Sequence, residues 1–119
     1  MDLAAFYRRY NACCNEHRFD DLAEFVADEV DVDGGIKTRA EYAGALQDVV
    51  DSFPDQRWEI QHLLVDADWI AAHFFNSGTH AATGRPVRTQ EFAFYRIAGG
   101  RIAEVWGTAD DLLVEQQLR

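Results

Sequence analysis

Pro54 divides the chain into two parts whose hydrophobic patterns differ. Before it, apolar residues recur every three or four positions, which is the spacing of amphipathic helices. After it, four long runs with β-type patterning are separated by short turn sequences. Helices followed by consecutive strands predict an α+β domain, with the helices packed on one face of an antiparallel sheet.

Three helices are expected in the first part. The first covers residues 2–17, with Asp2 placed as a cap or first-turn acid. A short second helix starts at Asp20, a favourable N-cap. The third starts at Thr38, and Glu41 three residues later completes the sequence of a capping box.

A short acidic stretch lies between the second and third helices. The second helix is expected to include Val26 in its apolar stripe. Residues 28–35 then alternate acidic residues with valines before a Gly pair, which predicts a short exposed strand and a turn. The aspartates lack the spacing and the final Glu of an EF-hand, so they do not predict a calcium loop.

The fourth long strand starts after a Gly-Gly turn and leads to two aspartates. If the strand is regular, Ile102, Trp106 and Asp110 share one face. Asp110 then has two interpretations: a carboxyl group in apolar surroundings that is suited to proton transfer, or a cap for the short helix expected over residues 112–118. The other three strands are expected at residues 57–65, 69–80 and 87–97.

Length and charge narrow the possible functions. With 119 residues the chain is expected to be one domain, residues 1–119. The net charge of −10 argues against nucleic acid and disfavours anionic membranes. No apolar run reaches the roughly 18 residues of a membrane span. The N-terminal residues do not resemble a secretory signal, and the adjacent Cys13 and Cys14 suit buried thiols in a reducing compartment, so a cytoplasmic protein is expected.

A curved sheet folded over amphipathic helices encloses an apolar cone that can hold a small ligand. Under regular alternation His73 and His80 lie on opposite faces of their strand, so at most one of them faces this cone. The histidine spacing does not match a metal site, and neither a phosphate-binding Gly loop nor a Gly-x-Ser-x-Gly motif occurs. Candidates for the lining are Tyr10, His62, His73, His80, Trp106 and Asp110.

Several short motifs run nearly end to end in a familiar order. They include Tyr10-Asn11, Ser52-Phe53-Pro54-Asp55, Ser77-Gly78-Thr79-His80, Phe94-Tyr95-Arg96-Ile97, Gly100 to Trp106, and Asp110. In this order and spacing the chain resembles the SnoaL-like polyketide cyclases of the NTF2-like superfamily. The resemblance implies a cone-shaped α+β barrel, in which three N-terminal helices pack on a strongly curved, mainly antiparallel sheet.

The resemblance also implies a chemistry. The Asp four residues after the strand Trp is the acid/base of these cyclases, which favours the catalytic interpretation of Asp110 over the cap. Asp110 would remove an activated proton for an aldol closure, with His80, His73 or Tyr10 donating to the enolate oxygen. No metal or organic cofactor is implied. The predicted catalytic residues are Asp110, His80 and His73, and the predicted substrate-binding residues are Tyr10, Trp106, Phe75, Phe94 and Tyr42.

Alternatives remain within the same fold. The polar partners that the cyclases give their Asp have no clear match, although the third strand offers Gln90, Glu91 and Tyr95. A non-catalytic small-molecule binding protein is therefore one alternative. A limonene-epoxide-hydrolase-like enzyme, which would use Arg88 or Arg96 beside Asp110, is another. The expected ligand is small and apolar, aromatic or polyketide-like, and pairing of two chains through the outer face of the sheet is expected by resemblance.

Overall fold

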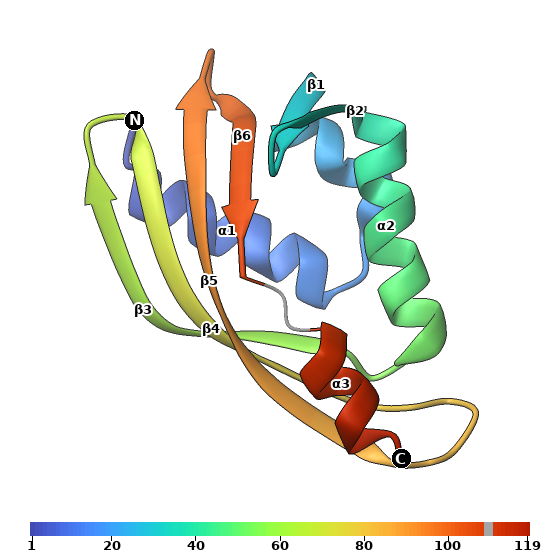
Figure 1. Cartoon of the computed structure of the whole chain (residues 1–119). Helices are drawn as coiled ribbons and strands as arrows, with labels where there is room; N and C mark the ends of the chain where they lie inside the picture. The colour runs from blue at the N-terminus through green and yellow to red at the C-terminus, as the bar shows by residue number, and fades with distance from the viewer. Residues whose placement is uncertain (109–110) are drawn as a thin grey trace.

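A computed structural model describes residues 1–108 and 111–119 of the chain (Figure 1). One 3₁₀ helix, η1, accompanies the α-helices and strands. In chain order the elements are α1 (Leu3–Asn15), η1 (Phe19–Glu24), β1 (Val26–Val32), β2 (Gly35–Thr38), α2 (Arg39–Ser52), β3 (Arg57–Asp66), β4 (Trp69–Thr79), β5 (Pro86–Ala98), β6 (Arg101–Gly107) and α3 (Asp111–Gln117).

The strands form one sheet in the order β2-β1-β6-β5-β4-β3. All neighbouring strands are antiparallel except β1 and β6, which are parallel. Figure 1 shows β3, β4 and β5 bending strongly along their length, so that the sheet curves around the helices without closing into a complete barrel. The α+β class, the helices on one side and the mainly antiparallel sheet are as the sequence predicts.

Two of the three predicted helix starts, at Asp2 and Thr38, are confirmed in atomic detail. The third is wrong, because η1 begins at Phe19 and Asp20 lies within it instead of capping it. The Asp2 carboxylate accepts a hydrogen bond from the Ala5 amide at 3.0 Å and caps α1. At the start of α2, the Thr38 hydroxyl accepts from the Glu41 amide at 3.1 Å, and the Glu41 carboxylate accepts from the Thr38 amide at 3.0 Å. These caps satisfy amide groups that the first helical turn leaves without partners.

The region after α1 differs from the prediction. The expected second helix is the short 3₁₀ helix η1, and Val26 lies in strand β1 instead. Val26 adopts a strand instead of a helix because Val26 and Val30 are buried on the inner side of the sheet, and Val26 pairs with Ile102 of β6. A β-branched run of this kind suits a strand, and a helix of one or two turns has little stability of its own. The predicted short strand and turn therefore become β1 and β2 of a six-stranded sheet.

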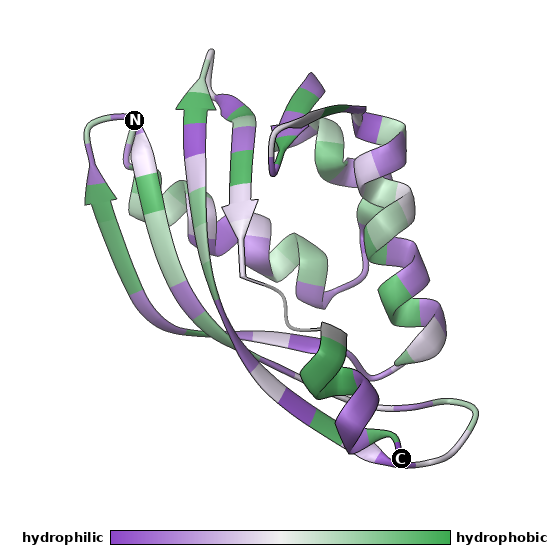
Figure 2. Ribbon diagram, in the orientation of Figure 1, coloured by the Kyte–Doolittle hydropathy of each residue, from purple (hydrophilic) through white to green (hydrophobic). Residues whose placement is uncertain are grey.

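The two faces of the sheet differ in burial. Along β5, Ala93, Tyr95 and Ile97 are buried while Phe92 and Phe94 are exposed. Figure 2 shows hydrophobic and hydrophilic residues succeeding one another along the long strands. The buried side chains pack against α1, η1 and α2 in one core cluster. Burying a single aliphatic or aromatic side chain contributes about 1.5–3 kcal/mol, so this face fixes the position of the helices.

Strand β6 does not alternate regularly. Its pairing with β5 shifts register between Ile97, opposite Ile102, and Arg96, opposite Glu104. As a result Ile102 and Val105 face the core, whereas Trp106 is 42% exposed on the other face. The expectation that Ile102 and Trp106 share a face is therefore wrong. A bulge places one extra residue in β6, so each later side chain of the strand points to the opposite face of the sheet from the one expected.

Candidate functional site

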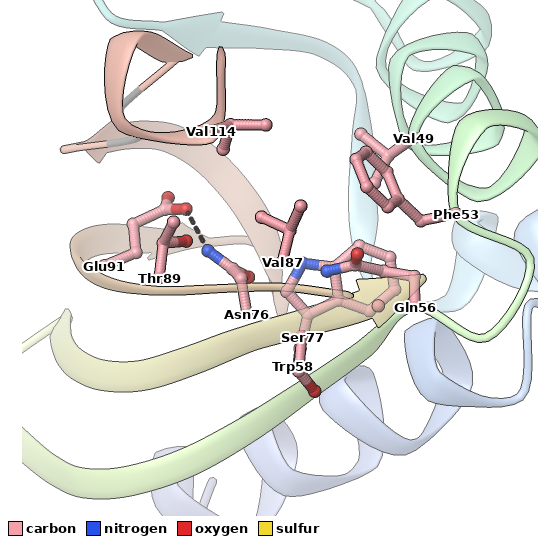
Figure 3. Close-up of a pocket in the computed structure, with 11 residues that line it drawn as sticks. Val49, Phe53, Gln56, Trp58, Asn76, Ser77, Val87, Thr89, Glu91 and Val114 are labelled. Atoms are coloured by element: carbon pink, nitrogen blue, oxygen red, sulfur yellow. Dashed lines mark hydrogen bonds between the residues drawn. The ribbon is translucent and has the colours of Figure 1, made fainter. Parts of the chain in front are cut away.

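The described residues line two cavities between the inner face of the sheet and the helices. One, here called the inner chamber, has a volume of about 200 Å³ and is lined from α1, α2 and four strands. The other, the outer chamber, has a volume of about 190 Å³ and lies between the end of α2, the strands β3 to β5, and α3 (Figure 3). Val49, Trp58 and Glu91 line both chambers. The chambers therefore meet at one shared wall.

Glu91 is the acidic side chain of this shared wall. It projects from β5 and is half-buried. Asn76 Nδ2 donates a hydrogen bond to Glu91 Oε1 at 3.1 Å, and Figure 3 shows this bond at the edge of the outer chamber. The register explains the contact, because Phe74 of β4 pairs with Glu91, and Asn76 lies two residues further along the same face. Pairing of adjacent strands thus holds a carboxyl group and an amide together against the cavity.

Gly107 makes room for that carboxyl group. A Cβ atom at Gly107 would lie 2.9 Å from Glu91 Oε2, closer than real Cβ contacts. Gly78 has a similar role in the outer chamber, where a Cβ atom would lie 2.9 Å from Phe53 Cβ. Both glycines therefore allow a side chain to approach the backbone of a neighbouring element closely.

The inner chamber is lined by all four tyrosines of the chain. The Tyr7 hydroxyl donates to that of Tyr95 at 3.3 Å, and the hydroxyls of Tyr10 and Tyr42 are hydrogen-bonded to each other. Burial raises the pKa of each phenol above its usual value of 10.0. Each pair uses one hydroxyl hydrogen for its internal bond and has a second one, so the neutral pairs can donate to an oxygen atom in the chamber.

Cys14 also lines the inner chamber. Both cysteines are buried free thiols, as the sequence predicts. Burial raises the pKa of the Cys14 thiol to about 12. The thiol therefore stays protonated near neutral pH, which does not suit a nucleophile.

The two predicted catalytic histidines lie away from both chambers. His73 lies on the outer face, where its Nδ1 is 2.9 Å from His62 Nδ1 and its ring stacks on Phe92 at 4.5 Å between centroids. His80 follows the end of β4, and its Nδ1 is 3.0 Å from Thr83 Oγ1. Their catalytic roles rest on the sequence resemblance, because neither side chain lines a chamber.

The structure separates the predicted substrate-binding residues into two groups. Tyr10 and Tyr42 line the inner chamber. Trp106, Phe94 and Phe75 belong to the outer face: Trp106 Nε1 donates to Glu104 Oε2 at 2.7 Å, Phe94 is 56% exposed, and the Phe75 ring lies under the Arg88 guanidinium at 4.4 Å. The first group alone is positioned to meet a ligand in the chambers.

Asp110, the predicted acid/base, lies outside the described residues. On one side of it, Gly107 leaves room for the Glu91 carboxyl group, and the Thr108 amide donates to the Phe92 carbonyl at 3.0 Å. On the other side, Val114 of α3 lines the outer chamber.

Asn76 is the site residue that the sequence patterns did not single out. Like Glu91, it is a polar residue at an inward position of a strand whose neighbours on that face are mostly apolar. This interruption of the pattern was a usable signal. Within residues 1–108 and 111–119, no group of three or more His, Cys, Asp or Glu side chains is arranged to hold a metal ion. In the same ranges, no helix has the length and apolar character needed to cross a membrane.

Comparison with known proteins identifies the family. A family model for SnoaL-like polyketide cyclases matches residues 4–118. The chain belongs to the SnoaL-like polyketide cyclase family. A comparison with curated protein sequences gave no match.

Solved structures agree with this SnoaL-like assignment. A SnoaL-like polyketide cyclase from Agrobacterium tumefaciens is 30% identical, with a TM-score of 0.90 over 100% of this chain and 99% of that one. IdmH from Streptomyces antibioticus, described as a candidate polyketide cyclase, is 22% identical, with a TM-score of 0.89 over 99% of each chain. The SnoaL-like fold thus covers the whole chain, and the reaction depends on what lines its chambers.

Proposed function

We propose that this SnoaL-like protein is a small-molecule enzyme that uses a carboxyl group as acid/base. The proposed reaction is a cofactor-independent aldol-type cyclisation, or a related isomerase or lyase proton transfer. One observation carries the proposal: the Glu91 carboxyl group forms part of the wall between two largely apolar chambers, with tyrosine hydroxyls lining one of them. An apolar cavity with few, well-placed polar groups is the usual form of a small-molecule site.

The chemistry needs one base and one set of hydrogen-bond donors. A carboxylate removes a proton from the carbon between two carbonyl groups, and the electron pair moves onto the carbonyl oxygen to give an enolate. The enolate carbon then attacks a third carbonyl group elsewhere in the same molecule, and the carboxyl group returns the proton to the new alkoxide. The tyrosine pairs suit the donor role, because their raised pKa values keep them protonated while they donate to the enolate oxygen.

Two carboxyl groups are candidates for the base. The family resemblance supports Asp110, and the chamber geometry supports Glu91. The rates at which Asp110→Asn and Glu91→Gln turn over a β-dicarbonyl ketone decide which of the two is the base. Loss of the carboxyl group that acts as the general base is expected to lower kcat about 10²–10⁴-fold. Loss of the other carboxyl group is expected to lower kcat by a smaller factor.

Glu29→Gln is the control for these variants, because Glu29 is an exposed carboxylate on β1. It removes one negative charge without touching either chamber, so turnover should stay at the wild-type level. Wild-type turnover by both Asp110→Asn and Glu91→Gln would refute acid/base catalysis by these carboxyl groups.

A non-catalytic binding protein is the second candidate function. The aromatic inner chamber favours it, since four tyrosines offer binding surface whether or not a reaction follows. Tight binding of a ketone ligand that is unchanged in Asp110→Asn and Glu91→Gln, with no turnover, would establish this alternative. The epoxide-hydrolase alternative lacks support from the described chamber linings. The arginines it would use lie on the outer face: Arg96 pairs with Glu104, and Arg88 covers Phe75.

We also propose that two chains pair through the outer face of the sheet. Phe92, Phe94 and Trp106 are 53%, 56% and 42% exposed there, and Leu64 of β3 is 70% exposed. Large exposed apolar side chains that lie near one another favour a protein interface. Light scattering should give twice the mass of one chain, and a mass of one chain at micromolar concentration would refute the pairing.

The cytoplasm is the proposed compartment. Cys13 and Cys14 are free, and reduced thiols are typical of reducing compartments. Fractionation of cells that produce the untagged chain tests this proposal, and recovery from the medium or the periplasm would contradict it.

A further inference from the structure

The Asn76 side chain has one satisfied end and one unsatisfied end. Its Nδ2 donates to Glu91 Oε1, which fixes the orientation of the amide, because a carboxyl oxygen accepts from the nitrogen and not from the amide oxygen. Asn76 Oδ1 is buried and has no hydrogen-bond partner among the described residues. A buried acceptor without a donor is unfavourable, and native structures contain few of them.

The position of this acceptor indicates what would satisfy it. Asn76 lines the outer chamber, and Figure 3 shows its side chain among the lining residues between Thr89 and Ser77. The donor that completes Asn76 can therefore come from a molecule in that chamber. A hydroxyl or N–H group can donate, whereas an ether or a second carbonyl group cannot.

The inner chamber has the opposite polarity. The tyrosine pairs that line it each have a hydroxyl hydrogen left to donate after their internal bond. A carbonyl oxygen is the matching acceptor on a ligand. The two chambers therefore suit different ends of one molecule, with an acceptor at the inner end and a donor at the outer end.

The volumes set the size of that molecule. The chambers measure about 200 and 190 Å³, and an apolar cavity of about 150 Å³ in another protein holds one benzene ring. Each chamber thus has space for one six-membered ring. Because both chambers border Glu91, the bond between the two rings would lie beside that carboxyl group.

We propose that the chambers bind a flat two-ring ketone whose carbonyl group faces the tyrosines and whose far ring carries a hydroxyl or N–H donor for Asn76 Oδ1. This proposal deepens the proposed function and rests on it for the site. It makes Asn76 the residue that selects for the donor on the outer ring.

Titration calorimetry with a matched set of ketones tests the proposal without turnover. The probes are tetralone, a hydroxytetralone with its hydroxyl at the end of the aromatic ring remote from the ketone, and the corresponding methoxytetralone. The hydroxytetralone should bind about tenfold more tightly than the other two, because only it donates to the buried acceptor. Hydroxyacetophenone, with one ring, should bind more weakly than the hydroxytetralone, and a three-ring anthrone should not fit.

The Asn76→Leu variant links the preference to the residue. In this variant the hydroxytetralone and tetralone should bind with equal affinity, even if loss of the hydrogen bond to Glu91 changes the affinity for both. Gln61→Ala, which removes an exposed amide on β3, is the matched control and should keep the tenfold preference. Because the preference is a ratio measured on one protein, a general loss of affinity does not imitate the result.

Two outcomes overturn the proposal: absence of binding by all of the two-ring probes, or equal binding of hydroxytetralone, methoxytetralone and tetralone by the wild type. The proposed function fails separately. If the preference is found but no ketone of this class is turned over, the ligand assignment stands and the enzymatic one falls.

Discussion

Gly107 and Glu91 lie against each other across strands β6 and β5, and a methyl group added at Gly107 would sit 2.9 Å from Glu91 Oε2. Gly107→Ala should therefore displace the carboxyl group without removing it. We expect kcat for the proposed reaction to fall about a hundredfold, because a shift of about 1 Å in a reacting group has an effect of that size. Steady-state kinetics measure the loss.

Gly44→Ala is the matched control for this substitution. Gly44 lies in α2, and an added Cβ would meet no atom within 4 Å. The change should leave turnover at the wild-type level and raise stability by up to about 1 kcal/mol, because alanine is the better helix former. Wild-type kcat in Gly107→Ala would show that the position of Glu91 does not matter for turnover.

The tyrosines predict how stability changes at high pH. Burial raises the pKa of all four phenols in the folded state above the value of 10.0 expected in the unfolded chain. Their contribution to stability is complete below pH 10.0 and is lost as the pH rises above it, by about 1.4 kcal/mol per pH unit for each phenol. Tyrosinate absorbance should stay flat through pH 10 and then rise in one step with the loss of circular dichroism. A phenol that titrates near pH 10 in the folded protein would contradict the burial of the tyrosines.

The outer face predicts a change in assembly. In the proposed pairing, Phe94→Glu places a negative charge on each chain in an apolar contact, so the dimer should dissociate at micromolar concentration. Sedimentation velocity measures the change. Ile36→Glu is the control, since Ile36 is exposed on the edge strand β2, and it should leave the dimer intact. Equal sedimentation of both variants and the wild type would exclude Phe94 from the interface.

The capping box of α2 predicts a modest change in the stability of the protein. Thr38→Ala removes the hydroxyl that accepts from the Glu41 amide, and should lower the free energy of unfolding by about 1 kcal/mol. Urea denaturation measures this difference. Lys37→Ala, one residue earlier and exposed, should change stability by less than about 0.5 kcal/mol. An equal loss in both variants would mean that the cap contributes nothing specific.

The caps of α1 and α2 and the long strands were predictable because they depend on local chemistry. Thr38 and Glu41 are three residues apart, and the alternation along β5 is visible in the sequence alone. The side on which Trp106 lies was not predictable in this way. It depends on a bulge in β6 that no residue type marks, and a shift of one residue transfers every later side chain to the other face.

The site was predictable in part. Tyr10 and Tyr42 were expected at the ligand and line the inner chamber. The pair formed by Asn76 and Glu91 depends on the relative register of β4 and β5, which a single sequence does not specify. For His73 and His80, alternation along the strand limited the prediction to at most one of them facing the cone. Their actual contacts, stacking of His73 on Phe92 and the bond of His80 to Thr83, depend on strand pairing and loop geometry that a single sequence does not specify.

The parallel pairing of β1 with β6 has a consequence for how the chain folds. Val26 and Ile102 are neighbours in the sheet although most of the chain separates them in sequence. Contacts between such distant residues require closure of a long loop and slow the folding of a small domain. The N-terminal helices α1, η1 and α2 and the strand β1 are synthesised first but lack a completed sheet to pack on until β6 has been made. The wall of the inner chamber, to which Val105 of β6 contributes, is therefore completed in a late step, when the last strand joins the sheet.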